Sequence, residues 1–172
     1  VDGSFFMKDE SAPAFYSVGV RNWSKPLEHE KYNIGYTAEY VFGSTDYTSD
    51  GTGTASGTPY SKLRLESYTI FQGSKNVTPY LGLGYRRLHT DGGGMTSSTG
   101  ASAYDRLSQY YYLPIGTFVA INENLYIKAQ YNVFIGGTQN SYLSDASSLY
   151  SDIENDQNTG YGIVLTADYK IS

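Results

Sequence analysis

Apolar and polar residues alternate along most of this chain with a period of two. In residues 32–43, YNIGYTAEYVFG, aromatic or aliphatic residues occupy every second position, and mainly polar residues and glycine lie between them. Side chains of a β-strand point alternately to its two faces, so this pattern predicts a strand with one apolar and one polar face. The pattern recurs at residues 78–90, 125–136 and 160–171, and more weakly at 14–25, 61–72 and 106–120. No window of useful length favours a helical period.

Short and long connections alternate between the predicted strands. The short ones are PLEHE, GSKN and INEN, and the long, polar ones lie at about residues 45–60, 91–105 and 140–158. This alternation places every long loop at one end of an antiparallel meander. Besides the seven clear strands, residues 1–10, followed by the turn-like SAPA, supply a short eighth strand, which places both termini at the short-turn end. Because closed bacterial barrels have even strand numbers, we predict one all-β domain over residues 1–172, an eight-stranded antiparallel up-and-down β-barrel.

The direction of the apolar faces decides between two kinds of barrel. If they pointed inward, the protein would be a soluble, ligand-binding barrel such as a lipocalin, but so many inward Tyr, Phe, Leu and Ile would overfill a narrow interior. The opposite faces carry glycine, small residues and a few charges, which suit a cramped polar lumen. Strands of about 10 to 14 residues also exceed the roughly 9–11 residues that a tilted strand needs to cross a bilayer. We therefore predict a transmembrane β-barrel with outward tyrosines, and the soluble barrel is the alternative.

Composition excludes several function classes. The chain has no cysteine, so it has no disulfide, thiolate metal site or cysteine nucleophile. Its formal net charge of −5 and its scattered basic residues argue against a nucleic-acid partner. Its 19 tyrosines suit a protein with many rings at a polar–apolar boundary. No apolar run approaches the about 18 residues of a transmembrane helix, and the first residues do not resemble a signal peptide, so we expect an exported form to have lost its signal.

Two stretches resemble a known family. Residues 78–86, TPYLGLGYR, and 112–131, YLPIGTFVAINENLYIKAQY, are similar to strand and hairpin motifs of small outer-membrane β-barrels of the OmpA, OmpX and opacity-protein type. The resemblance covers most of the chain from about residue 31 and concerns barrel geometry rather than an activity. It implies the outer membrane of a Gram-negative-type bacterium, extracellular long loops, and contact with membrane lipid and lipopolysaccharide. That family usually ends in an aromatic residue, whereas this chain ends in Tyr169-Lys170-Ile171-Ser172, so we expect either that a residue has been lost or that the assembly signal is non-standard.

Charged residues on the polar faces are the first candidates for a site inside the barrel. They are Arg21, Glu39, Arg64, Glu66, Arg86, Lys128 and Asp168, with Lys170 beside them. If the hairpin at 45–60 is symmetric, Glu39 lies across from Glu66, with Arg64 on the diagonal. The next hairpin places Arg64 opposite Arg86. We therefore expect a neutral quartet in the half of the lumen nearer the long loops.

A second group of charges, Lys128 with Asp168 and Lys170, is expected toward the short turns. Since an unpaired charge in a narrow lumen costs several kcal/mol, the interpretation that fits best is a lumen plugged by ion pairs. The alternative is a narrow gated channel for ions or small solutes. A catalytic pair of Glu39 and Glu66 is disfavoured, because neighbouring arginines would keep both carboxylates ionised.

The long loops carry the remaining candidates. Tyrosines among Ser, Gly and Asp are typical of adaptable binding surfaces, and five lie here: Tyr47, Tyr60, Tyr104, Tyr142 and Tyr150. The acidic residues of these loops lack the spacing of a calcium loop, and neither His29 nor His89 has partners for a catalytic triad, so we expect no metal site, cofactor or enzyme activity. We predict a monomeric structural or surface-interaction protein, adhesin-like, with loops that contact a host or another cell.

Overall fold

A single antiparallel sheet makes up the part of the chain that the structure describes. The computed structural model describes residues 7–11 and 15–169. Its strands are β1 (Met7–Ser11), β2 (Tyr16–Asn22), β3 (Tyr32–Ser49), β4 (Gly53–Phe71), β5 (Val77–Thr90), β6 (Asp105–Ala120), β7 (Leu125–Tyr142), β8 (Ile153–Gln157) and β9 (Tyr161–Tyr169). A 3-10 helix, η1 (Leu143–Asp145), follows β7. In these residues no helix has the length and apolar character needed to cross a membrane.

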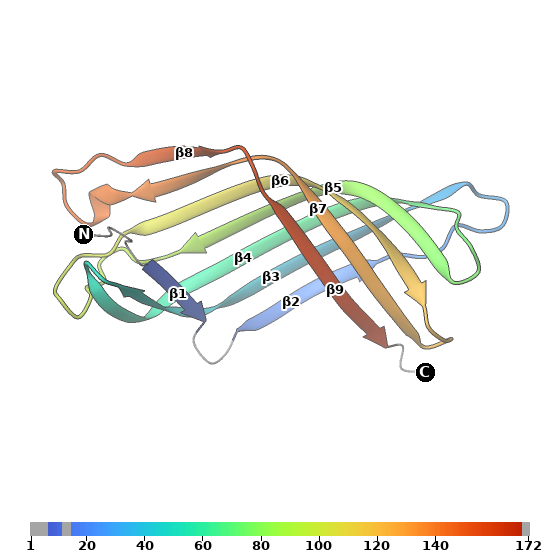
Figure 1. Cartoon of the computed structure of the whole chain (residues 1–172), viewed down its shortest axis with the longest axis horizontal. Helices are drawn as coiled ribbons and strands as arrows, with labels where there is room; N and C mark the ends of the chain where they lie inside the picture. The colour runs from blue at the N-terminus through green and yellow to red at the C-terminus, as the bar shows by residue number, and fades with distance from the viewer. Residues whose placement is uncertain (1–6, 12–14, 170–172) are drawn as a thin grey trace, which may run out of the picture.

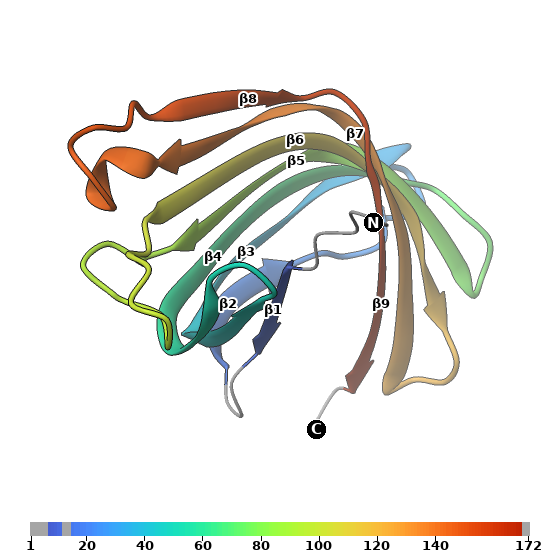
Figure 2. The same cartoon turned by 60° about the vertical axis from the view of Figure 1, so that its left-hand side comes forward.

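The strands follow one another across the sheet in chain order. The order is β1-β3-β4-β5-β6-β7-β8, while β2 lies beside β3 and β9 beside β7. β1 and β2 therefore lie end to end along one edge of β3, and β8 and β9 lie end to end along β7. The sheet curls into a half-barrel (Figures 1 and 2). This confirms the predicted all-β antiparallel up-and-down fold, and the curvature is compatible with an eight-stranded barrel.

The first strand does not have its predicted place. The sequence predicts that residues 1–10 form a separate strand that reverses at SAPA. Instead, β1 and β2 are both antiparallel to β3, so they run in the same direction, and Met7 lies opposite Ser49 at the long-loop end. Weak alternation in these residues gives no direction, whereas the long β3 offers a free edge for pairing. Residues 1–6 and 12–14 lie outside the described residues.

Two of the three predicted loops are partly strand. β3 and β4 continue to Ser49 and Gly53, so most of 45–60 is a long hairpin rather than a loop. Residues 140–158 contain the end of β7, η1 and β8. The third loop lies between β5 and β6, close to its predicted bounds. The polar composition of the first two reflects strands without an apolar face, which periodicity does not detect.

The two faces of the sheet have opposite environments. We call the face with the exposed apolar side chains the outer face; Val18 is 66% exposed there, Leu83 67% and Leu165 74%. On the inner face, side chains of the central strands meet across the curled sheet, and many of them are buried. The apolar inner residues are Tyr68, Ile70, Tyr80 and Phe118, with Trp23 packed against them. The alternating apolar residues therefore point outward, as the pattern predicts.

Glycines on the inner face make room for tyrosine rings. A Cβ atom on Gly84 would lie 2.3 Å from the ring of Tyr112. One on Gly116 would lie 2.4 Å from both the carbonyl oxygen of Ala129 and the hydroxyl of Tyr80. Since such distances are impossible for real atoms, glycine at these positions allows the bulky rings to fill the narrow interior.

Candidate functional site

A buried polar cluster occupies the inner face. This lumen cluster consists of Glu66, Tyr68, Tyr80, Tyr112, Lys128 and Gln130, from strands β4 to β7. Its centre is an ion pair in which Lys128 Nζ lies 3.6 Å from Glu66 Oε2. Their side chains are 2% and 0% exposed, so this pair is shielded from solvent.

Hydrogen bonds satisfy the buried Glu66 carboxylate. Tyr112 donates its hydroxyl to Oε1 at 2.9 Å, and Gln130 donates its amide to the same oxygen at 2.8 Å. Tyr68 donates to Oε2, where Lys128 also lies. A buried carboxylate with this many partners avoids the large penalty of an unsatisfied charge. The cluster thus cross-links four strands across the interior.

The Lys128 ammonium is held as completely as its partner. It donates to the Tyr68 hydroxyl at 2.9 Å. It also lies over three rings, 4.6 Å from the centroid of Tyr68, 5.4 Å from Tyr80 and 6.0 Å from Phe118. A cation favours the face of an aromatic ring, particularly where water is excluded. The inner tyrosines therefore serve as ligands of a buried charge as well as filling space.

The other predicted charges form smaller groups nearer the long loops. Glu39 lies 3.3 Å from Arg64 Nε and 3.4 Å from Lys62 Nζ. Arg64 lies opposite Arg86, as the sequence predicts. Arg86 is exposed and lies over the ring of Tyr110, 5.1 Å from its centroid, and it forms no ion pair with the described residues. The predicted quartet is therefore divided between this region and the lumen cluster.

The register of the β3–β4 hairpin explains the division. Glu39 lies opposite Arg64 rather than Glu66. The prediction depends on a symmetric loop at residues 45–60. In the structure the turn lies between Ser49 and Gly53, before the centre of that range, and the pairing shifts at a bulge between Thr45 and Tyr47. Because Glu39 does not lie opposite Glu66, the two carboxylates pair with different cations, Glu39 with Arg64 and Glu66 with Lys128.

The second predicted group also divides. Lys128 belongs to the lumen cluster, whereas Asp168 on β9 accepts a hydrogen bond of 2.5 Å from Arg21 on β2. Lys170 lies outside the described residues. Periodicity identified these residues as inward-facing, but it carries no information on contacts between strands far apart in the sequence.

Sequence reasoning missed the uncharged members of the lumen cluster. Tyr68, Tyr80, Tyr112 and Gln130 provide most of its hydrogen bonds. A signal for them existed, since Tyr68 shares the alternation of Arg64 and Glu66. The alternation places these uncharged side chains on the inner face, but only charged residues of that face are candidates by residue type.

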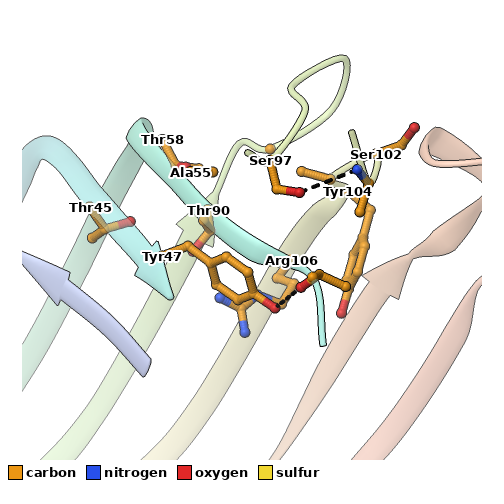
Figure 3. A pocket seen from close by; sticks show the side chains of 13 residues that line it. Thr45, Tyr47, Ala55, Thr58, Thr90, Ser97, Ser102, Tyr104 and Arg106 are labelled. Atoms are coloured by element: carbon orange, nitrogen blue, oxygen red, sulfur yellow. Dashed lines mark hydrogen bonds between the residues drawn. The ribbon is translucent and has the colours of Figure 1, made fainter. Parts of the chain in front are cut away.

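A second candidate lies among the long loops. This mouth pocket has a volume of about 110 Å³, and Figure 3 shows the side chains around it. It is lined by Thr45, Tyr47, Thr52, Ala55, Thr58, Thr90, Gly92, Ser97, Ala101, Ser102, Ala103, Tyr104 and Arg106. The lining combines two phenol rings, several hydroxyls and a guanidinium. Because most of the exposed lining is nonetheless apolar, the pocket suits a small, mainly apolar ligand that carries a few hydrogen-bonding groups.

Hydrogen bonds fix the walls of the mouth pocket. Thr99 in the loop between β5 and β6 donates its hydroxyl to the Thr52 carbonyl at 2.8 Å. Thr54 and Ser98 are joined by two hydrogen bonds, of 3.0 and 2.7 Å. Tyr47 lies 2.9 Å from Thr52 through their hydroxyls. The β5–β6 loop is therefore attached to the tip of the β3–β4 hairpin, and hydrogen bonds hold the two sides of the pocket together.

Only two of the five predicted loop tyrosines lie at the same site. Tyr47 and Tyr104 both line the mouth pocket. Tyr60 packs edge-on against Phe15, with centroids 5.5 Å apart. Tyr142 ends β7, and Tyr150 is 60% exposed in the turn after η1. The structure thus selects Tyr47 and Tyr104 from a larger set that composition could not rank.

The described residues contain no group of three or more His, Cys, Asp or Glu side chains placed to hold a metal ion. His89 Nε2 lies 3.8 Å from an oxygen of Asp105. Neither residue lines the mouth pocket.

Comparison with known proteins adds no assignment. No family model matches this sequence, and no curated protein or solved structure matches it significantly.

Proposed function

We propose that this protein is a small outer-membrane β-barrel of a Gram-negative-type bacterium. In this proposal it is a monomer that anchors a surface-interaction site, the mouth pocket, above the membrane. Membrane lipid and lipopolysaccharide surround it, and a host or cell-surface ligand binds at the long loops. It requires no cofactor and has no catalytic role.

The observation that carries the proposal is the outer face. Its exposed residues are large and apolar on every long strand, including Ile34, Leu65, Leu83, Ile115 and Ile135. Large contiguous apolar surfaces on soluble monomers are rare and mark contact with a partner or a membrane. Alternation of apolar outward residues with a polar interior is the signature of a transmembrane barrel.

Introducing a charged residue on the outer face tests whether that face contacts lipid or water. We expect Leu83→Arg to lower the free energy of unfolding in lipid vesicles by about 2–4 kcal/mol, as for arginine near the centre of a bilayer. If water covered this exposed position, the change would stay within about 0.5 kcal/mol. Urea unfolding of the vesicle-inserted protein, followed by tryptophan fluorescence, gives the comparison.

Leu149→Arg is the matched control, because Leu149 is 90% exposed in the turn between η1 and β8. It should leave the unfolding free energy unchanged. Equal, small effects of both substitutions, together with solubility without detergent, would favour the soluble ligand-binding barrel and contradict the membrane proposal.

The mouth pocket supports the surface-interaction role. Vesicles that carry the protein should bind cultured epithelial cells more strongly than empty vesicles, and a Tyr47→Ala/Tyr104→Ala variant should lose most of that difference. Tyr150→Ala is the control, since Tyr150 lies outside the pocket lining. Equal binding by the two variants would remove the pocket from the proposal.

The alternative function is a narrow gated channel. It is favoured by Arg86, an exposed inward charge without an ion pair among the described residues. It requires the lumen cluster to open, although its central charges are fully buried. The buried pair makes the anchoring role the better-supported proposal.

A further inference from the structure

Among residues 7–11 and 15–169, the two outer edges of the sheet have no backbone partner on their free sides. In the described residues β2 pairs with β3 alone, and β9 pairs with β7 alone. We call the gap between β2 and β9 the seam; Figure 2 shows the curled sheet open there. An edge strand presents a row of N–H and C=O groups that can pair with another strand.

Strand direction prevents the two edges from joining in the pattern of the rest of the sheet. β2 is antiparallel to β3, and β9 is antiparallel to β7. β3 and β7 run in the same direction, because β4, β5 and β6 each reverse between them. β2 and β9 are therefore parallel to each other. One strand of opposite direction between them would be antiparallel to both.

One side-chain contact joins the two edges across the seam. Arg21 on β2 reaches Asp168 on β9 at 2.5 Å. The long arginine side chain spans the seam, while no backbone pairing joins the two strands. Adjacent strands lie about 4.8 Å apart, so one inserted strand would separate the edges by roughly 10 Å.

We propose that the seam binds one extended β-strand that runs from the short-turn end to the long-loop end. Residues beside the seam on the outer face are apolar, such as Val18, Val20 and Leu165. On the inner face they are small or polar, such as Gly19 and Thr166. The occupant therefore alternates apolar residues toward the outside with small or polar residues toward the lumen, over roughly 9–11 residues.

A second copy of the sheet is a poorer occupant. β2 of one copy against β9 of another would again be parallel. Two β2 edges pair antiparallel only if the long loops of the copies point in opposite directions. Loops of copies in one membrane emerge on the same side, and this step rests on the proposed function. An opposed single strand satisfies both edges without that conflict.

The test uses a peptide with the sequence of residues 125–136, LYIKAQYNVFIG, because β7 pairs antiparallel with β9 through this segment. The peptide carries Tyr131→Cys, and the full chain carries either Val18→Cys or Leu165→Cys. The chain has no native cysteine, so each crosslink reports one chosen site. A control peptide also carries Gln130→Pro and Asn132→Pro, which remove backbone donors.

We expect the peptide to crosslink to both chain variants in detergent at least ten-fold faster than the proline peptide, and to form a 1:1 complex by native mass spectrometry. Heat-modifiable migration of each variant on a gel checks that it has folded. Crosslinking to one edge alone, or no excess over the proline control, would overturn the proposal. So would rapid disulfide formation within a Val18→Cys/Leu165→Cys chain, or chain dimers joined through Val18→Cys, since the edges would then be closed without an inserted strand.

Discussion

At the scale of single residues, the main finding is how completely the interior satisfies one buried ion pair. Glu66 and Lys128 come from strands far apart in the sequence, yet together with three tyrosines and a glutamine they satisfy each other's charge and hydrogen-bonding groups. Such a pair adds little stability by itself, but removing one partner leaves a buried charge uncompensated. Replacing one member of the pair should therefore lower the free energy of unfolding more than replacing both members.

Lys128→Met should lower the free energy of unfolding by about 3–5 kcal/mol, because the Glu66 carboxylate would lose its cation in a buried site. Adding Glu66→Gln should recover part of this loss, since the second change removes the stranded charge. Denaturant unfolding in detergent measures both. Lys62→Met is the control and should cost less than about 1 kcal/mol, because Lys62 is partly exposed and Arg64 also faces Glu39. Equal costs for Lys128→Met and Lys62→Met would contradict this account.

Gly116→Ala should destabilise the protein by about 1–3 kcal/mol, because its Cβ would overlap the Ala129 carbonyl and the Tyr80 hydroxyl. Gly136→Ala is matched to it, since no atom lies within 4 Å of the added Cβ. The difference in unfolding free energy between the two variants is the measurement. A smaller loss for Gly116→Ala than for Gly136→Ala would show that the interior is not tightly packed there.

Residue-scale prediction from the sequence succeeded for orientation and failed for partners. Alternation correctly placed Glu66 and Lys128 on the inner face. It assigned Glu66 to a quartet with Glu39, because the register of a hairpin depends on where its turn and bulge lie, and one shifted residue changes every opposite pair. It also could not show that Lys128 crosses the interior, since no local pattern records how the sheet curls.

At the scale of elements, the long loops are more ordered than their composition indicates. β3 and β4 pair to within a few residues of the turn, and the β5–β6 loop is hydrogen-bonded to their tip. The β7–β8 hairpin is closed by its own contact, in which the Ser144 backbone N–H donates to Asp152 at 3.0 Å. The polar sequence, rich in Gly and Ser, predicted loops rather than strands here. Pairing of backbone groups does not require apolar side chains, so alternation could not show these strands.

The Asp152 contact gives the β7–β8 hairpin a pH dependence. Hydrogen bonds from the Ser144 backbone and side chain hold the pKa of Asp152 below its usual value near 3.8. The folded form therefore binds this proton less readily than the unfolded form, so the stabilisation is complete above the usual value and is lost as the pH falls through the lowered one. The protection of the Ser144 amide against exchange, relative to the intrinsic rate at each pH, should stay high near pH 5 and fall in strong acid. In Asp152→Asn the exchange should no longer follow this titration, and an unchanged profile would contradict the contact.

At the scale of the whole molecule, the sheet separates an apolar outside from a polar inside that its own side chains fill. The sequence predicted the class of fold and the direction of the faces, because both follow from a period of two. It did not predict that β1 and β2 share one edge, since that depends on how far β3 extends and not on the alternation of residues 1–10.

Planar-bilayer recording should therefore show no discrete conductance steps for the wild-type protein. Arg86→Ala should behave in the same way, because the lumen cluster, not Arg86, closes the interior. If Arg86→Ala produced or raised single-channel steps, the gated-channel alternative would replace the anchoring role. The Lys128→Met variant serves as a positive comparison, since weakening the lumen cluster is the change expected to admit water.

If the protein spans an outer membrane as proposed, the length of the β3–β4 hairpin sets the distance from the membrane at which a ligand binds. β3 has 18 residues, or roughly 60 Å of strand, whereas about 9–11 tilted residues cross a bilayer. Under that proposal, the remaining paired residues extend beyond the membrane surface, and residues at the end of the hairpin line the mouth pocket. A binding site held on paired strands would lie away from the lipid headgroups and would lose little conformational entropy on binding, which favours this hairpin as the support of the site. Side chains on it can be exchanged for new specificities while the main-chain ladder stays the same.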